Sequence, residues 1–163
     1  MVNSLPIVDL AEVAQELADS PEIWWPKVRR DCGDRWYVPL LQDDVFEAWL
    51  LGWPVGGGIE LHDHGRSSGA LIVVEGTLVE TYIGSYAWVR PGARIRHRRL
   101  PQGALVPFGP DHIHDVVNGG GRPALSIHTY SPRLCSMTFY ENRPGSGLAP
   151  VRTEVSRTGL VRA

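Results

Sequence analysis

The chain has 163 residues, of which 43% are hydrophobic and 21% charged, and its formal net charge at pH 7 is −2. A chain of this length is most economically one domain with its own core, and so small a net charge gives no electrostatic reason to expect nucleic acid or an anionic membrane as a partner. The apolar runs are far shorter than a membrane span and no signal peptide is apparent, so we expect a cytoplasmic protein, its oligomeric state left open.

Residues 1–34 favour helices. Asp9 can cap a first helix, with Glu12 completing a capping box, and apolar residues then recur at helical spacing. Ser20 followed by Pro21 is typical of a second helix start, with serine as the cap and proline at the first helical position. We therefore expect an N-terminal helical segment, residues 1–34, packed on the domain that follows.

From Arg35 onward the chain consists of short stretches rich in β-branched and aromatic residues, separated by glycine and proline turns. We expect strands at residues 45–51, 59–62, 70–75, 77–83, 86–90, 104–108, 113–118, 124–130 and 137–141. Strands at this spacing predict a small antiparallel barrel or jelly roll over residues 35–142. Residues 94–99 carry five cationic or titratable side chains, which is typical of a solvated edge strand.

Residues 143–163 are polar and rich in glycine and proline, which favours a flexible C-terminal tail. The two cysteines, Cys32 and Cys135, lack the spacing of a redox or metal motif. We expect both to be reduced, inert thiols.

A pair of histidines marks the most informative segment of the chain, residues 56–76. His62 and His64 flank one residue in an apolar, strand-like run that begins with three glycines. Side chains two apart on a strand leave the same face, with Cβ atoms about 7 Å apart, so two imidazoles can bind one metal ion. A tightly held metal needs a third protein ligand. His112 and His114 are again two apart on an expected strand, and both are candidates.

These histidines belong to two motifs that resemble those of the cupins. The first comprises Gly56, the His62-Asp63-His64 triplet and Gly76, and the second comprises Pro107-Phe108-Gly109, His114 and Asn118. Most cupins place a glutamate ligand five residues after the second histidine, where this chain has Gly69. That loss, together with Ser126, His128 and Tyr130, resembles the cysteine dioxygenase branch of the cupins over about residues 35–132.

The resemblance implies an all-β cupin double-stranded β-helix barrel, with the short helices added at the N-terminus. It also implies that Fe(II) is held by His62, His64 and His114 without a carboxylate, while His112 lies near the rim. Three neutral ligands would leave the iron its full charge for a substrate thiolate. The partners implied are a small thiol, L-cysteine or a close analogue, and dioxygen.

Ser126, His128 and Tyr130 alternate along one expected strand, so they point to one face. The resemblance implies a relay in which His128 orients Tyr130 and the tyrosine hydroxyl donates a hydrogen bond to the bound substrate. An ordinary barrel-lining aromatic is the alternative for Tyr130. In animal members this tyrosine is cross-linked to a cysteine, and Gly69 at the corresponding position excludes that cross-link here.

The substrate-binding residues depart from the family. Cysteine dioxygenases hold the substrate carboxylate with an arginine two residues after a tyrosine, and here Tyr37 is followed at that place by Pro39. Proline has no charge to offer. We expect Tyr37 to keep its place and Arg66 to supply a replacement charge, with Arg35 and Arg133 as weaker candidates. A solvent-facing loop residue is the alternative for Arg66.

The leading hypothesis is therefore an iron-dependent oxygenase that oxidises the sulfur of a small thiol. Because Pro39 replaces the anchoring arginine, an alternative is a diverted oxidation of cysteine with loss of the carboxylate and a sulfonamide-type product. A third hypothesis is a non-catalytic cupin that binds a metal or a small ligand, although such a module has little need of a relay ending at Tyr130.

Overall fold

The structure is a computed structural model that describes residues 4–30, 33–83, 95–143 and 147–155. In these ranges the helices are α1 (Ile7–Ala18) and α2 (Pro21–Trp24), followed by a 3-10 turn, Trp25–Lys27. The strands are β1 (Trp36–Gln42), β2 (Glu47–Trp53), β3 (Gly58–His62), β4 (Ser68–Glu75), β5 (Thr77–Ile83), β6 (Ile95–Pro101), β7 (Leu105–Phe108), β8 (Ile113–Val117), β9 (Ala124–Ser131), β10 (Ser136–Arg143) and β11 (Gly147–Val155). Among the described residues, no helix is both long enough and apolar enough to cross a membrane.

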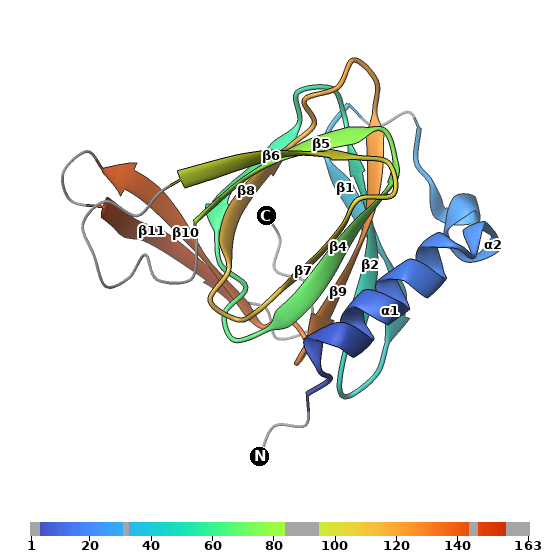
Figure 1. The fold of residues 1–163 in the computed structure, drawn as a ribbon, viewed down its shortest axis with the longest axis horizontal. Helices are drawn as coiled ribbons and strands as arrows, with labels where there is room; N and C mark the ends of the chain where they lie inside the picture. Colours follow the sequence, from blue (N-terminus) through green and yellow to red (C-terminus); the bar gives the residue numbers. More distant parts are fainter. Residues whose placement is uncertain (1–3, 31–32, 84–94, 144–146, 156–163) are drawn as a thin grey trace.

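The strands form two antiparallel sheets that together make a barrel (Figure 1). One sheet has the order β1-β2-β9-β4-β7 and the other has the order β11-β10-β3-β8-β5-β6. Strands that pair are mostly distant in sequence; β9, for example, lies between β2 and β4. The expected all-β barrel with short N-terminal helices is confirmed, and the site can draw side chains from both sheets.

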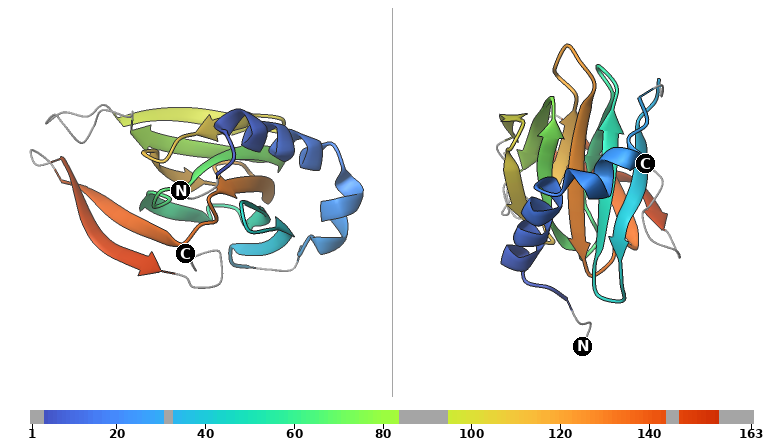
Figure 2. Two further views of the ribbon diagram at one scale, coloured as in Figure 1. Left: turned by 90° about the horizontal axis from the view of Figure 1, so that it is seen from below. Right: turned by 90° about the vertical axis from the view of Figure 1, so that its right-hand side faces the viewer.

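The two faces of the five-stranded sheet are both covered, which explains why β2 is buried along its whole length. Trp49, Leu51 and Trp53 alternate into a cluster inside the barrel, whereas Ala48 and Leu50 join a second cluster beneath the helices. Helix α1 lies across this outer face, against β4, β7 and β9 (Figures 1 and 2). It buries an apolar stripe of Leu10, Ala14 and Leu17.

The first helix starts differently from the prediction. It begins at Ile7 directly after Pro6, and no side chain caps it. The predicted cap, Asp9, lies instead in the first turn, where its negative charge suits the helix dipole. The second helix does begin at Pro21 with Ser20 before it, but no side-chain capping bond forms there and the helix ends after one turn.

The prediction of a flexible tail from residue 143 is wrong for residues 147–155. These residues form β11, which pairs along its length with β10 in a hairpin that extends beyond the barrel (Figures 1 and 2). Strand β1 was also absent from the predicted set, and β6 is the edge strand that the basic run 94–99 indicated. Cys135 is free and exposed. The expected strand 86–90 and Cys32 lie outside the described residues.

Candidate metal centre

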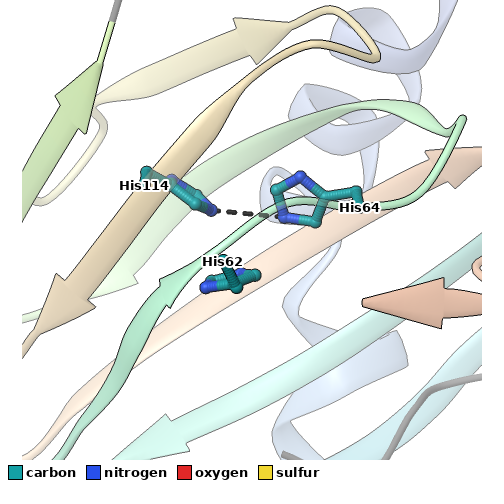
Figure 3. Close-up of side chains that lie close together, drawn as sticks. All are labelled: His62, His64 and His114. Carbon is teal, nitrogen blue, oxygen red and sulfur yellow. Dashed lines mark hydrogen bonds between the residues drawn. The ribbon is translucent and has the colours of Figure 1, made fainter. Parts of the chain in front are cut away.

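Three buried histidines meet inside the barrel (Figure 3). His62 ends β3 and pairs across the sheet with His114 of β8, and His64 follows two residues after β3. The ring centroids are 4.8 Å apart for His62 and His114, and 4.9 Å apart for each of the pairs that include His64. Each imidazole offers a ligand atom, and the three atoms lie within 4.8 Å of one another.

Contacts behind the rings set which nitrogen of each imidazole faces the centre. His62 Nδ1 lies 2.7 Å from the carbonyl oxygen of Glu60, and His114 Nδ1 lies 2.7 Å from Oε1 of Glu80. Both partners only accept, so each Nδ1 carries the proton and each Nε2 presents a lone pair. His64 Nε2 lies 3.2 Å from His114 Nε2, and His64 Nδ1 has no hydrogen-bond partner within the described residues.

The electrostatics keep these imidazoles neutral. Burial, followed by the neighbouring histidines, lowers the pKa of His62 and His64 well below the ordinary value, and burial also lowers the pKa of His114. Neutral imidazoles with lone pairs aimed at one point form a donor set that suits a divalent transition metal. In the metal-free protein the His64 and His114 Nε2 atoms share a hydrogen bond, which a bound cation would replace. The residues present therefore fit a metal site.

His112 points away from this centre, toward Glu80. The carboxylate of Glu80, fully buried on β5, accepts from His112 Nε2 at 2.9 Å as well as from His114 Nδ1, and Arg98 donates to its other oxygen. Burial raises the pKa of Glu80, but the hydrogen bonds from the two histidines outweigh this and hold the pKa far below its ordinary value. His112 is partly exposed and groups with Glu80 rather than with His62 and His64.

Ser126, His128 and Tyr130 form a hydrogen-bonded row along β9, and all three are buried. Ser126 Oγ lies 2.9 Å from His128 Nε2, and His128 Nδ1 lies 3.1 Å from the Tyr130 hydroxyl. The row has a fourth member that the sequence analysis missed: Trp53 Nε1 donates to Ser126 Oγ at 2.8 Å. Burial lowers the pKa of His128 to about 3 and raises the pKa of Tyr130, so both are neutral near pH 7.

A cavity joins the two groups of residues. Its wall contains His62 and His114 from the histidine cluster and His128 and Tyr130 from the row on β9, together with Arg35, Tyr37 and a set of apolar side chains. A small molecule in this cavity would touch both a metal held by the histidines and the tyrosine hydroxyl. The arrangement can therefore bind and polarise one small substrate between a metal and a neutral hydrogen-bond donor.

The cavity receives its positive charge from Arg35. This residue lies two positions before Tyr37, is partly buried, and has its guanidinium carbon 5.4 Å from the Trp53 ring centroid. Burial lowers the pKa of Arg35, although a guanidinium stays charged at any ordinary pH. Arg66, which the sequence analysis favoured, is exposed and is not among the residues that line this cavity, and Pro39 is exposed on β1.

The packing around Gly69 leaves no room there for a side chain that could reach the histidine cluster. Gly69 of β4 lies opposite Tyr130, and a Cβ atom there would come within 2.3 Å of the Thr129 carbonyl oxygen and 2.5 Å of the Phe108 ring. The Phe108 ring in turn stacks on His64, with ring centroids 4.7 Å apart. An aromatic side chain thus covers the side of the centre next to the position where most cupins carry a glutamate ligand.

Comparisons with known proteins agree with this geometry. A sequence profile of the family described as cysteine dioxygenase type I matches residues 18–143. A cysteine dioxygenase type 1 of Danio rerio is 24% identical over 157 residues, which cover 88% of this chain and 74% of that protein. An auxin-binding protein of Prunus persica is 33% identical over 76 residues, 47% of this chain and 34% of that protein.

A solved cupin domain from Schizosaccharomyces pombe matches the fold with a TM-score of 0.52 at 12% identity, over 65% of each chain. This similarity concerns the fold alone. Together with the two antiparallel sheets, it confirms the cupin barrel that the two histidine motifs predicted.

Proposed function

The chain belongs to the cysteine dioxygenase type I family and is thus an oxygenase, and we propose that it is iron-dependent and acts on L-cysteine or a close analogue. The observation that carries the proposal is the cavity in which two of the three clustered histidines, His62 and His114, face Tyr130. The family and the histidine cluster support a thiol dioxygenase with a metal site.

In this proposal His62, His64 and His114 hold Fe(II). The bound iron would supply the redox chemistry that joins dioxygen to the substrate sulfur. The protein's part is to bury three neutral imidazoles side by side and, for His62 and His114, to hold the proton on Nδ1 so that Nε2 is free for the metal. A set of neutral ligands also leaves net positive charge for an anionic thiolate.

We assign a donor-to-acceptor order to the hydrogen bonds of the row on β9. An indole N–H can only donate, so Ser126 accepts from Trp53, and we assign the serine's own proton to His128 Nε2. The proton of the neutral His128 is then on Nδ1, where it is donated to the Tyr130 oxygen. This order leaves the Tyr130 O–H to donate into the cavity, toward the sulfur or oxygen of the substrate. Burial raises the pKa of Tyr130, which keeps that proton in place.

Arg35 is the proposed anchor for the substrate carboxylate, with Tyr37 beside it. Both side chains line the cavity, whereas Arg66 is exposed outside its wall. The diverted, decarboxylating reaction was inferred from the loss of an arginine at Pro39. Arg35, two residues before Tyr37 in the sequence, brings a cation to the cavity. The reason for expecting decarboxylation is therefore weaker, and ordinary oxidation to a sulfinate is the proposed outcome. The cytoplasmic location stays a prediction.

The direct test is dioxygen uptake by protein loaded anaerobically with Fe(II), over a panel of cysteine, cysteamine, homocysteine and 3-mercaptopropionate, with products identified by mass. We expect cysteine to be consumed with one equivalent of dioxygen and to gain two oxygen atoms, with a carbon label at the carboxyl position retained. No uptake with any thiol by fully loaded protein would contradict the proposal, and release of the label would favour the diverted reaction.

Matched variants test the ligand assignment in the same assay. Single replacements of His62, His64 or His114 by alanine should abolish stoichiometric iron binding, because two imidazoles hold a labile divalent ion poorly. His112→Ala should retain most of the iron, since this side chain points to Glu80. Iron lost from His112→Ala but kept by His114→Ala would show the assignment to be wrong.

A further inference from the structure

Glu80 has no part in the proposed function, although it is a fully buried carboxylate. It lies in the middle of β5, directly opposite Arg98 of β6 and Val116 of β8. A buried carboxylate is strongly unfavourable unless its oxygens are paired. A residue of this kind next to a proposed metal ligand needs a physical explanation.

All of the partners of Glu80 are donors. Oε1 accepts from His112 Nε2 at 2.9 Å and from His114 Nδ1 at 2.7 Å, and Oε2 accepts from Arg98 Nε. The three contacts fix the carboxylate from β6, from β8 and from the turn before β8. The carboxylate is thus rigidly held, and its shortest contact to a histidine is with the one that faces the cavity.

Glu80, His112 and His114 are also close enough to hold a cation by themselves. Metal ligands must offer lone pairs, however, and here the two imidazole nitrogens that face the carboxylate are placed to donate protons to it. Arg98 pairs with the other carboxylate oxygen, which lowers the attraction of Glu80 for a second cation. The contacts therefore favour an acceptor that holds two imidazoles over a second metal site.

The three proposed ligands differ in the hydrogen-bond partner of their Nδ1 atom. His62 Nδ1 is bonded to a neutral backbone carbonyl, His64 Nδ1 has no partner within the described residues, and His114 Nδ1 is bonded to a carboxylate. A carboxylate behind a ligating histidine fixes its tautomer and raises the basicity of the nitrogen that binds the metal. His114 is thus the ligand best placed to donate electron density.

We propose that Glu80 is a positioning residue for the metal: it holds His114 in the Nδ1–H tautomer and supplies, through that bond, the negative charge that three neutral ligands lack. The inference rests on the proposed metal role of His114. It places the compensating carboxylate one hydrogen bond away from the metal. A thiolate substrate could then occupy the open positions without competing with a carboxylate ligand.

The test measures metal binding and redox potential rather than turnover. Metal-free wild type, Glu80→Gln and Glu80→Asp are titrated with Co²⁺ in competition with a chelator, and the midpoint potential of the iron-loaded forms is measured. We expect both variants to bind Co²⁺ about 10–100-fold more weakly, the usual effect of removing such a partner. The potential of the iron should rise, because negative charge near the metal has been removed or withdrawn. The aspartate variant keeps a buried charge for Arg98 if the glutamine variant folds poorly.

Glu47→Gln is the matched control. Glu47 is equally buried and pairs with Arg133 and the Leu134 amide, but among the described residues it makes no hydrogen bond to a histidine. It should leave the Co²⁺ affinity within about threefold of wild type. Equal losses in Glu80→Gln and Glu47→Gln, or an unchanged affinity and potential in Glu80→Gln, would overturn the inference.

Two further outcomes are distinguishable. Two Co²⁺ equivalents in wild type, of which His112→Gln loses one, would make Glu80 a ligand and overturn the positioning role while leaving the proposed function intact. Failure of the wild-type protein to bind any Co²⁺ would overturn both the metal centre and this inference. One equivalent, retained by His112→Gln and weakened by Glu80→Gln, is the expected result.

Discussion

At the scale of single residues, Trp53 determines the direction of the hydrogen bonds that end at Tyr130. Trp53→Phe removes the indole N–H that Ser126 accepts from, and with it the contact that favours donation from Ser126 to His128. We expect turnover to fall about tenfold, the low end for a group that assists proton transfer, with iron content unchanged. Turnover per bound iron is the measurement.

The control for that variant is Trp49→Phe. Trp49 is another buried indole of β2, and its Nε1 has no hydrogen-bond partner within the described residues. The same aromatic truncation there should cost stability but change turnover per iron by less than about twofold. If both variants lose turnover equally, Trp53 acts through packing alone and the assigned direction is wrong.

Arg35 and Arg66 are expected to differ in their effect on substrate binding. Arg35→Gln should raise the KM for cysteine by about 10–150-fold, corresponding to about 1.5–3 kcal/mol for a hydrogen bond between charged groups. The KM for cysteamine, which has no carboxylate, should change little. Arg66→Gln, an exposed position, should change neither KM by more than about twofold. The reverse pattern would restore Arg66 as the anchor.

The difference between these arginines shows why the sequence pattern did not predict which of them lines the cavity. The pairs of histidines two apart are visible in the chain because a strand alternates its side chains. Arg35 precedes the first strand, and Arg66 follows Gly65, whose φ of +61° lies in the left-handed region. No periodic pattern says which way a side chain leaves such a segment. The one available signal was that Arg35, like the lost arginine at Pro39, is two residues from Tyr37.

At the scale of elements, the pairing of β4 with β9 leaves no room for a side chain at Gly69. Gly69→Ala should lower the free energy of unfolding by about 1–3 kcal/mol, the usual cost of overpacking, because its Cβ would overlap a backbone oxygen and the Phe108 ring. Urea unfolding is the measurement. Gly121→Ala, where a Cβ would meet nothing within 4 Å, is the control.

The same crowding predicts that Gly69→Glu does not create a fourth metal ligand. If Gly69→Glu folded with wild-type stability and bound metal more tightly, the crowding at this position would have been misjudged. The comparison is informative because the glutamate ligand of most cupins corresponds to this position.

The two strands missing from the prediction, β1 and β11, both lie at sheet edges. The run 77–83 has the same bounds in the sequence prediction and in β5, because alternation and flanking glycine mark it. Strand β11 is largely exposed, and its conformation comes from pairing with β10 rather than from burial of its own side chains. The strand pairings that bring Trp53 within hydrogen-bond distance of Ser126, and Glu80 opposite Arg98, are a tertiary property and were not predicted.

At the scale of the whole molecule, the site requires both sheets. The histidine cluster comes from β3, the segment after it, and β8 of one sheet, while Tyr130 and Trp53 come from β9 and β2 of the other. The helices stabilise the second sheet from outside by burying Leu17 and Trp24 against it. The division into residues 1–34, 35–142 and 143–163 stays a prediction, although these contacts make the first segment part of the same packed unit.

The concentration of buried neutral histidines makes the stability of the metal-free protein depend on pH. Burial lowers the pKa of His128 to about 3, from an ordinary value near 6.5. Between these values the unfolded chain binds a proton at this site that the folded protein does not bind. The stabilisation is therefore complete above about pH 6.5 and is lost as the pH falls toward 3.

His128→Gln should consequently flatten the dependence of stability on pH, whatever it does to stability itself. We expect the slope of the free energy of unfolding between pH 5 and 6.5 to decrease by about 1 kcal/mol per pH unit, somewhat less than the value for one full proton, about 1.4. Urea unfolding of chelator-treated protein at several pH values measures it. Equal slopes in wild type and His128→Gln would mean that His128 is protonated in the folded protein, and the hydrogen bonds assigned from Trp53 to Tyr130 would then have to run in a different order.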